Sequence, residues 1–466
     1  MTGVLNRDLN PRRVALVLVE HALIVLSMML VAIARLGMVN VSIPAAGELL
    51  WRASLVAAVL QLSLHYCDLY DLRTLADRRD LFRGLLRALG AASFILAVLY
   101  YWVPMLIIGR GVFAVASVLI VALVAGWRIA FEWLSLRGVP TERLLIVGTA
   151  GAAVALAREL FERRSELGVE LVGFVDTDPA KVGTSLINPG IIGTISDIPA
   201  IVRDRKVDRV VVSLAEARGK LPMEELLAMK LNQGVRFDHL PSVYEKYTGK
   251  IAVENLRPSW LIFSEGFRHS AFSFGVKRFT DVCLSSIGLL LAAPIMLIIA
   301  PLVRLTSPGP ALYSQARVGK DGILFTIYKF RTMVVDAEAA TGAVWAKAGG
   351  DPRATKLGTF LRRSRLDELP QLWNVLRGDM SFVGPRPERP EFIAELTKQI
   401  PFYGQRHVVR PGLTGWAQVR HRYGATVQDS LQKLQYDLFY IKHMSSAFDL
   451  FVVFETVKTV LMKMGS

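Results

Sequence analysis

Two adjacent carboxylic acids, Asp367 and Glu368, stand in a stretch of the chain that is rich in arginine. Arg362, Arg363 and Arg365 come just before the pair, and Arg386 follows on a Pro-Arg-Pro turn. Guanidinium groups bind phosphate through paired hydrogen bonds, and Mg²⁺ takes carboxylate oxygens together with substrate phosphates. The pattern therefore predicts a site for a phosphate group and its metal ion.

A short amphipathic helix is expected directly after the acid pair. The spacing i, i+3, i+4 and i+7 is occupied by Leu369, Leu372, Trp373 and Leu376, which predicts a helix that buries this face. Asp367 would then lie at the helix entrance. For an isolated Asp the simpler interpretation there is an N-cap that accepts backbone N–H bonds. The surrounding arginines favour the phosphate site.

Three long motifs, in order, carry a family resemblance. They are Lys329-Phe330-Arg331-Thr332-Met333, the run from Asp367 to Pro387, and Arg410-Pro411-Gly412-Leu413-Thr414-Gly415-Trp416-Ala417-Gln418. Together they resemble the bacterial sugar transferases, which are monotopic polyprenyl-phosphate phosphoglycosyltransferases. The similarity covers residues 275 to 466.

The resemblance implies an enzyme with a two-step reaction. Sugar-1-phosphate would pass from a UDP-sugar to polyprenyl (undecaprenyl) phosphate with release of UMP, as the first membrane step of exopolysaccharide or glycoconjugate synthesis. By motif position Asp367 would be the nucleophile that forms a phosphoglycosyl-aspartate. Glu368 would help to bind Mg²⁺, together with Asp367, or would orient the incoming phosphate.

The same resemblance implies a set of residues that bind the phosphates and the nucleotide: Lys329, Arg331, Arg362, Pro385, Arg386, Pro387, Arg410 and Gln418. For the two cations of the upstream motif, surface charges on a strand edge are the alternative. Asp437 also falls on a recurrent acidic position of the family. A structural capping role for Asp437 remains open.

Composition points to a membrane and to anionic partners. The chain has 466 residues, room for about three domains, and 52% of them are hydrophobic. The net charge of +15 suits lipid headgroups, phosphorylated substrates or nucleic acid. Residues 396 to 428 contain no Asp or Glu, but no nucleic-acid motif appears, so we expect no nucleic-acid partner. Cys67 and Cys283 imply neither a disulfide framework nor a cysteine metal site.

Residues 1 to 140 are predicted to form a bundle of four transmembrane helices. The apolar segments are residues 14 to 36, 49 to 66, 88 to 109 and 111 to 134. Basic residues precede the first segment and fill the connection after the second, namely Arg12, Arg13, Arg73, Arg78, Arg79, Arg83 and Arg87, so both ends of the bundle are expected in the cytoplasm. Glu20 and His21 lie inside the first segment, where snorkelling or packing is the preferred interpretation.

Residues 141 to 266 are predicted to form a Rossmann-like module. Leu144 to Val147, Leu171 to Val175 and Arg209 to Val212 read as strands, with helices over 150 to 164 and 222 to 232. The turn after the first strand has Ala150 and Ala153 where a dinucleotide fingerprint needs glycine, and Asp176 ends a later strand. Since a Tyr-x-x-x-Lys pair is also missing, we expect a non-catalytic module.

Residues 270 to 466 are predicted to form the catalytic domain, which begins with a re-entrant membrane helix over 277 to 304. The apolar run Val282 to Val303 is flanked by basic residues on both sides, which argues against opposite sides of the membrane. Ala293-Pro294 would break the helix, because proline removes a backbone hydrogen bond. The resembled family usually has Ser-Pro there. An ordinary proline-kinked fifth span is the alternative.

The expected fold class is thus a four-helix transmembrane bundle, an α/β Rossmann-like module and a membrane-associated α/β catalytic domain with a re-entrant helix. The resemblance implies a multi-pass protein of the bacterial inner membrane with a cytoplasmic catalytic domain, in contact with its lipids. It also implies a homodimer and UDP-glucose or UDP-galactose as donor, with N-acetylated sugars left open. The alternatives are a non-enzymatic scaffold of a polysaccharide assembly complex and a membrane-tethered NAD-dependent oxidoreductase built on residues 141 to 265.

Overall fold

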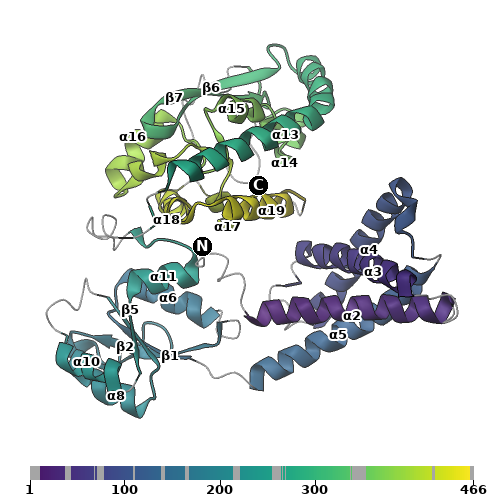
Figure 1. Cartoon of the computed structure of the whole chain (residues 1–466). Helices are drawn as coiled ribbons and strands as arrows, with labels where there is room; N and C mark the ends of the chain where they lie inside the picture. The colour runs from purple at the N-terminus through teal and green to yellow at the C-terminus, as the bar shows by residue number, and fades with distance from the viewer. Residues whose placement is uncertain are drawn as a thin grey trace.

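The chain forms three parts that follow one another in sequence (Figure 1). A helical bundle comes first, an α/β sheet domain second and a larger α/β part last. The computed structural model describes residues 11–36, 43–67, 69–70, 78–108, 111–137, 142–162, 167–213, 221–232, 234–253, 264, 266–267, 269–335, 337, 353–421, 424 and 426–461.

The bundle consists of four long helices: α2 (Pro11–Leu36), α3 (Ile43–Tyr66), α4 (Arg78–Trp102) and α5 (Val112–Arg137). Each is long and apolar enough to cross a membrane. The third helix begins and ends earlier than the predicted segment 88 to 109. The chain turns into the 3₁₀ helix Pro104–Leu106 after Trp102, because a proline disfavours helical geometry in the residue before it. Arg73 lies outside the described residues.

The ionisable residues of the first helix hold the bundle together. Glu20 is fully buried and accepts hydrogen bonds from Arg128 of α5, at 2.6 Å to Nε and 3.0 Å to Nη2. Nη1 of Arg128 donates to the carbonyl of Leu69. His21 contacts Gln61 of α3 through its Nδ1 at 2.9 Å. Both residues therefore serve packing between helices, one of the two interpretations that the sequence favoured.

We expect Glu20→Gln to lower the thermal stability of the detergent-solubilised protein strongly. Removing one partner of a buried ion pair leaves the other charge unpaired and costs about 3–5 kcal/mol. Glu48→Gln is the matched control, because its carboxylate is exposed and pairs with Arg52 one helical turn away, where such pairs contribute less than about 1 kcal/mol. Equal melting temperatures for the two variants would contradict a structural role of the buried pair.

The second part is a five-stranded parallel sheet in the order β3-β2-β1-β4-β5. The strands are β1 (Glu142–Val147), β2 (Val169–Asp176), β3 (Ile191–Thr194), β4 (Arg209–Val212) and β5 (Arg236–His239). Helices α6 (Gly151–Glu162) and α11 (Leu240–Thr248) cover one face, while α8 (Ile198–Asp204) and α10 (Met223–Asn232) cover the other. The predicted doubly wound α/β pattern is confirmed, with two more strands than the sequence indicated.

In the turn that a dinucleotide would occupy, the key carboxylate already accepts hydrogen bonds from groups of the same chain. Asp176, at the end of β2, accepts hydrogen bonds from the Thr149 hydroxyl, from the Asp178 backbone N–H at 2.9 Å and from Lys181 at 3.2 Å. A carboxylate at this position would hold the ribose in a working dinucleotide domain. Its internal partners favour the non-catalytic interpretation of this module.

The third part opens with α13 (Ala271–Thr306). The hairpin β6 (Leu312–Val318) and β7 (Leu324–Phe330) follows, and a short parallel pair joins β8 (Ser381–Val383) to β9 (Gly412–Thr414). Helix α13 continues through Pro294 without an interruption of helical conformation, so the predicted break at Ala293-Pro294 is not a gap in the helix. Proline in a helix interior produces a kink, and Figure 1 shows α13 changing direction along its course.

The last helices connect the three parts. Helices α17 (Trp416–Arg420), α18 (Val427–His443) and α19 (Ser446–Leu461) form one apolar core around Trp416. Glu245 of α11 pairs with Lys442 at 2.8 Å and with His443 at 2.6 Å. His65 at the end of α3 contacts Glu455 of α19 at 3.0 Å. The C-terminal part therefore contacts both the sheet domain and the bundle.

Candidate active site

The acid pair lies on a tight turn between two helices. The 3₁₀ helix η8 (Leu366–Glu368) separates α14 (Lys356–Arg363) from α15 (Gln371–Arg377). Arg365, just before it, has a left-handed backbone with φ of 58°, a conformation that non-glycine residues rarely adopt and that often marks functional sites. This turn directs Asp367 and Glu368 inward, and both are buried.

Helix α15 buries Leu372 of the predicted apolar face, which is 5% exposed, but it does not bury Trp373. Trp373 is 51% exposed, whereas Asn374 and Val375 are fully buried. The Asn374 side chain donates to the Thr326 carbonyl at 2.7 Å and accepts from the Tyr328 N–H at 3.1 Å. The predicted burial of Trp373 is thus wrong, because polar bonds to β7 fix the rotation of this short helix.

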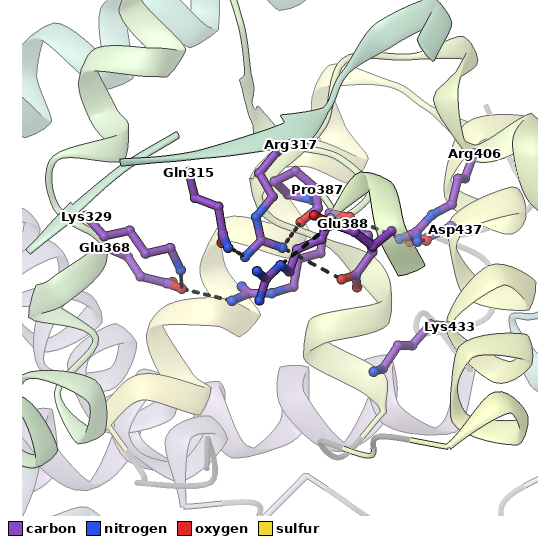
Figure 2. Close-up of polar contacts among 12 residues, drawn as sticks. Gln315, Arg317, Lys329, Glu368, Pro387, Glu388, Arg406, Lys433 and Asp437 are labelled. Carbon is purple, nitrogen blue, oxygen red and sulfur yellow. Dashed lines mark hydrogen bonds and ion pairs between the residues drawn. The ribbon is translucent and has the colours of Figure 1, made fainter. Parts of the chain in front are cut away.

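Glu368 is held by three cations from separate segments. Its Oε1 lies 2.9 Å from Nζ of Lys329 on β7 (Figure 2). The same oxygen lies 3.1 Å from Nη2 of Arg386 and 3.7 Å from Nη1 of Arg365. Burial raises the pKa of this carboxyl, but the positive charges of Lys329, Arg386 and Arg365 outweigh it and lower the pKa below its usual range. Glu368 therefore stays ionised at neutral pH.

Asp367 has the opposite electrostatic character. Burial and the negative charge of Glu368 raise its pKa, while Lys329 and the neighbouring arginines oppose the shift. Its Oδ1 is buried and makes no hydrogen bond within the described part of the chain. The alternative of an N-cap is not borne out, because the N-cap positions of η8 and α15 are Arg365 and Pro370. The side chain keeps an oxygen available for a phosphorus atom or a metal ion.

The pair also fits a magnesium ion by its chemistry. Mg²⁺ is usually held by one or two carboxylates together with substrate phosphates and water. Asp367 offers a buried oxygen without a partner, and Glu368 is the adjacent ionised carboxylate. No third His, Cys, Asp or Glu of the described residues completes an all-protein site. The residues present fit an ion that is shared with a phosphorylated substrate.

The Pro385-Arg386-Pro387 loop is fixed through its backbone. The Arg386 carbonyl accepts a bond from Arg406 at 3.1 Å, and the Pro387 carbonyl accepts one from Arg317 at 3.1 Å. Gly412 N–H donates to the Pro385 carbonyl at 2.8 Å. Arg317 comes from β6, far away in sequence, and Arg406 from the 3₁₀ helix Tyr403–Val408. The sequence analysis gave neither arginine a role at this loop, because a bond to a backbone carbonyl leaves no residue pattern in the sequence.

The strand before this loop is held by α13 and the last helices. Asp281 of α13 accepts bonds from the Ser381 hydroxyl at 3.0 Å and the Phe382 N–H at 2.8 Å. The Val383 carbonyl accepts from Lys277 at 2.9 Å and from the Tyr440 hydroxyl at 3.0 Å. An acid at the start of an apolar helix was a signal that could have identified Asp281. Helix α13 and the Arg386 loop are thereby joined.

Asp437 supports the same loop indirectly. It lies in the middle of α18, is 1% exposed and accepts a bond from Arg406 at 2.8 Å. Nη1 of Arg406 donates to the Tyr403 hydroxyl at 2.6 Å. The capping alternative is therefore wrong, since a cap lies at a helix end. Burial raises the pKa of Asp437 to about 6.

Comparison with known proteins identifies the family. The family model described as bacterial sugar transferase matches residues 272–463, and one described as CoA-binding domain matches residues 65–228. A UDP-glucose:undecaprenyl-phosphate glucose-1-phosphate transferase of Escherichia coli (strain K12) is 33% identical over 349 residues, 74% of this chain and 73% of the relative. The chain belongs to the bacterial sugar transferase family. It is a membrane-associated enzyme of the phosphoglycosyltransferase class.

Two further relatives of this sugar transferase differ in the sugar that their names give. A UDP-glucose:undecaprenyl-phosphate glucose-1-phosphate transferase of Xanthomonas campestris pv. campestris is 32% identical over 337 residues, 70% of this chain and 68% of the relative. A UDP-N-acetylgalactosamine-undecaprenyl-phosphate N-acetylgalactosaminephosphotransferase of Aeromonas hydrophila is 39% identical over 261 residues. That match covers 56% of this chain and 60% of the relative.

The sugar transferase brings only some of its predicted site residues together. Lys329, Arg386 and the acid pair meet as described. Arg362 lies near by and donates from Nε to the Thr332 hydroxyl at 3.0 Å. Arg331 is not among them, because its guanidinium donates to the carbonyls of Ser307 and Pro308 at the end of α13. Arg410 is exposed, and Gln418 has a buried Oε1 without a partner among the described residues.

The pH dependence of the sugar transferase should report on Asp437. Its pKa is about 6 in the folded state and near 3.9 in an unfolded chain. Between these two values the folded protein binds more protons than the unfolded chain, so protonation of Asp437 increases the free energy of unfolding as the pH falls. Protonation removes the ionic partner of Arg406, however, and loosens the Arg386 loop. We expect kcat/KM to fall below about pH 6 without a loss of stability.

Asp437→Asn should lower the rate of UMP release at pH 7.5 by about tenfold or more, since small displacements of positioning groups carry such costs. It should also abolish the acid limb near pH 6. Asp321→Asn is the control, because that carboxylate is exposed in the turn between β6 and β7. A limb that persists unchanged in Asp437→Asn would assign it to another group, such as Asp367.

Proposed function

We propose that this sugar transferase moves a sugar-1-phosphate from a UDP-sugar to polyprenyl phosphate, releasing UMP and forming polyprenyl-diphospho-sugar. The observation that carries the proposal is the acid pair: Asp367 has a raised pKa and a buried oxygen without a hydrogen bond, while Glu368 is ionised and bound by Lys329 and Arg386. A nucleophile and a fixed anion side by side suit transfer of a phosphoryl group.

The reaction proceeds in two displacements at one phosphorus atom. The Asp367 carboxylate attacks the sugar-bearing phosphorus of the donor, and the bond from that phosphorus to the bridging oxygen breaks, so that UMP leaves. An oxygen of polyprenyl phosphate then attacks the same phosphorus, and the Asp367 carboxylate leaves with both electrons of its bond. Each step forms one phosphorus–oxygen bond and breaks another, and no oxidant or reductant is needed.

The surrounding side chains bind and orient the phosphates. Arg386 and Lys329 present positive charge to the reacting group from two sides of Glu368, and Arg362 approaches from α14. Bound Mg²⁺, held by Asp367 and Glu368, would supply further neutralisation of the phosphate oxygens. Because these donors are fixed before the substrate arrives, little reorganisation accompanies the reaction.

The contacts of α13 support a re-entrant course of this helix through the membrane. Near its start Asp281 bonds Ser381 and Phe382, and near its end Ile299 and Val303 pack on Phe330 of β7. Because both ends of α13 contact one domain, we propose that this helix enters the membrane and returns to the same side. We place that domain in the cytoplasm, at the bacterial inner membrane.

Single cysteines introduced at Gly275 and Lys320, on either side of the apolar run, should be labelled from the same side of the membrane. Labelling from opposite sides would refute the re-entrant topology.

The test of the function is an assay with purified protein. A panel of UDP-glucose, UDP-galactose, UDP-N-acetylglucosamine and UDP-N-acetylgalactosamine is supplied with polyprenyl phosphate and Mg²⁺, and both UMP and the diphospho-lipid are measured. The relatives' names favour a glucose or an N-acetylgalactosamine donor. Metal removal with EDTA should stop turnover. Absence of UMP with every donor would refute the proposed reaction.

We also propose a homodimer, which the resemblance to the family implies. Mass photometry of the purified protein tests this proposal.

A further inference from the structure

Gln371, the first residue of α15, is a buried amide that has no role in the steps above. It is 3% exposed, and its Nε2 is buried without a hydrogen-bond partner among the described residues. An amide nitrogen carries two N–H donors, and buried polar groups of folded proteins are almost always hydrogen-bonded. Such a donor indicates an acceptor that comes from outside the chain.

Contacts on either side place Gln371 on the face of α15 that meets β7. Three residues earlier, Oε1 of Glu368 lies 2.9 Å from Nζ of Lys329 on β7 (Figure 2). Three residues later, the Asn374 side chain accepts a bond from the Tyr328 N–H of the same strand at 3.1 Å. Residues three and four apart along a helix are neighbours on its surface. Gln371 therefore lies between these two contacts, at the edge of the acid pair.

Asp367 precedes Gln371 by four residues on the same helical path. Leu369 and Pro370, which separate η8 from α15, have right-handed helical backbones with φ of −53° and −62°, so the path continues from one element to the other. The two side chains therefore occupy neighbouring positions. Oδ1 of Asp367 is also buried without a hydrogen bond among the described residues. A donor and an acceptor that both lack a partner thus lie together at the candidate site.

A phosphoryl group satisfies both of these atoms at once. In the proposed reaction its phosphorus is the atom that an oxygen of Asp367 attacks, and its other oxygens are strong hydrogen-bond acceptors. A neutral amide donates to such an oxygen without adding a further cation beside Lys329. Because burial fixes this donor before the substrate arrives, little reorganisation accompanies the reaction.

We propose that Gln371 is a further catalytic residue, which donates a hydrogen bond from Nε2 to an oxygen of the phosphoryl group that Asp367 attacks. This role rests on the proposed function. It predicts that loss of the amide slows formation of the phosphoglycosyl-aspartate and does not weaken the fold.

Gln371→Met tests this role, because methionine has a similar length but no N–H donor. Purified full-length enzyme is mixed with UDP-sugar and Mg²⁺ without polyprenyl phosphate, and the adduct is followed by mass spectrometry over a single turnover. We expect adduct formation to slow at least tenfold, since loss of one fixed donor to a reacting oxygen costs about a hundredfold or more elsewhere. The melting temperature of the free protein should stay the same or rise, because a buried amide without a partner is unfavourable.

Gln399→Met is the matched control. Gln399 is exposed at the end of α16 (Pro390–Gln399), where its side chain donates to Glu395, and its variant should form adduct at the wild-type rate. An adduct rate in Gln371→Met equal to that of the wild type would overturn the proposal. A melting temperature that falls in both Gln371→Met and Gln371→Leu would also overturn it, because the amide would then stabilise the free protein.

Binding of inorganic phosphate is a measurement that does not depend on the reaction. With Mg²⁺ present, phosphate should raise the melting temperature of the wild type, and half of this effect should need at least tenfold less phosphate than in Gln371→Met. Equal concentrations, or no effect on either protein, would overturn the role of Gln371. Absence of adduct in the wild type, with the difference in phosphate binding intact, would refute the covalent route alone.

Discussion

Asp367→Asn should reduce UMP release by at least about a thousandfold while the protein stays folded. The amide is nearly isosteric with the carboxylate but is a poor nucleophile towards phosphorus, so the covalent route is lost. A loss of this size corresponds to about 4 kcal/mol in the activation barrier. Incubation with donor alone should give no mass shift in the variant, whereas the wild-type protein should gain one sugar phosphate.

The stability of Asp367→Asn should move in the other direction. Asp367 is a buried acid whose pKa is raised by burial and by Glu368, and its Oδ1 has no hydrogen bond among the described residues. Neutralising such a group relieves its desolvation and its repulsion from the neighbouring charge. We expect an unchanged or higher melting temperature. A variant that is inactive and also unstable would indicate a structural role, and near wild-type turnover would refute the assignment as nucleophile.

The acid pair could be found from the sequence because its chemistry is local. Asp367, Glu368 and the arginines of the same stretch lie within a few positions of one another, and the strand that delivers Lys329 alternates clearly. Long-range partners had no such signal. Arg317 and Arg406 reach the Arg386 loop from other segments, and their roles depend on backbone carbonyls that no side-chain pattern encodes. Asp281 instead accepts bonds from the Ser381 hydroxyl and the Phe382 N–H of the strand before the loop, and its position at the start of an apolar helix marks it only as an unusual acid.

Errors of the sequence analysis have physical causes of the same kind. In a helix of seven residues such as α15, the periodic pattern fits more than one face. Asn374 is buried because it bonds the Thr326 carbonyl, and the helix rotation that this bond requires leaves Trp373 exposed. Arg331 was grouped with Lys329 because they lie two residues apart, yet it caps the end of α13 instead. The parallel sheet and the apolar helices were predictable, since strand runs and long apolar segments are strong signals.

Removing Glu368 should damage both activity and stability. Glu368→Gln takes away the anion that Lys329 and Arg386 share, and a buried cation left unpaired costs about 3–5 kcal/mol. Lys329→Met should cost a similar amount, because Glu368 then loses its nearest partner. Each variant should lower turnover by at least about a hundredfold, since in the proposed mechanism Lys329 presents positive charge to the reacting phosphate and Glu368 positions Lys329, Arg386 and the bound Mg²⁺.

The double variant distinguishes a paired role from two separate ones. In Glu368→Gln/Lys329→Met both charges are absent, so we expect a loss of stability smaller than the sum of the single losses. The exposed pair Arg143 and Glu170, 3.2 Å apart, is the control and should give a coupling below about 1 kcal/mol. Additive losses at Glu368 and Lys329 would contradict their pairing.

The stability lost in Glu368→Gln should depend on pH in a defined direction. Burial already lowers the pKa of Lys329, and Glu368 opposes that shift, so Glu368→Gln should lower this pKa further. A lysine whose pKa is lower in the folded than in the unfolded state binds fewer protons when folded, and stability then rises with pH between the two values. Glu368→Gln should therefore regain stability relative to the wild type as the pH rises through the range between the Lys329 pKa of the variant and the higher Lys329 pKa of the wild type, both of which lie below the unfolded value of about 10.4. A difference that stays constant over this range in thermal melts would show that Lys329 remains charged without its partner.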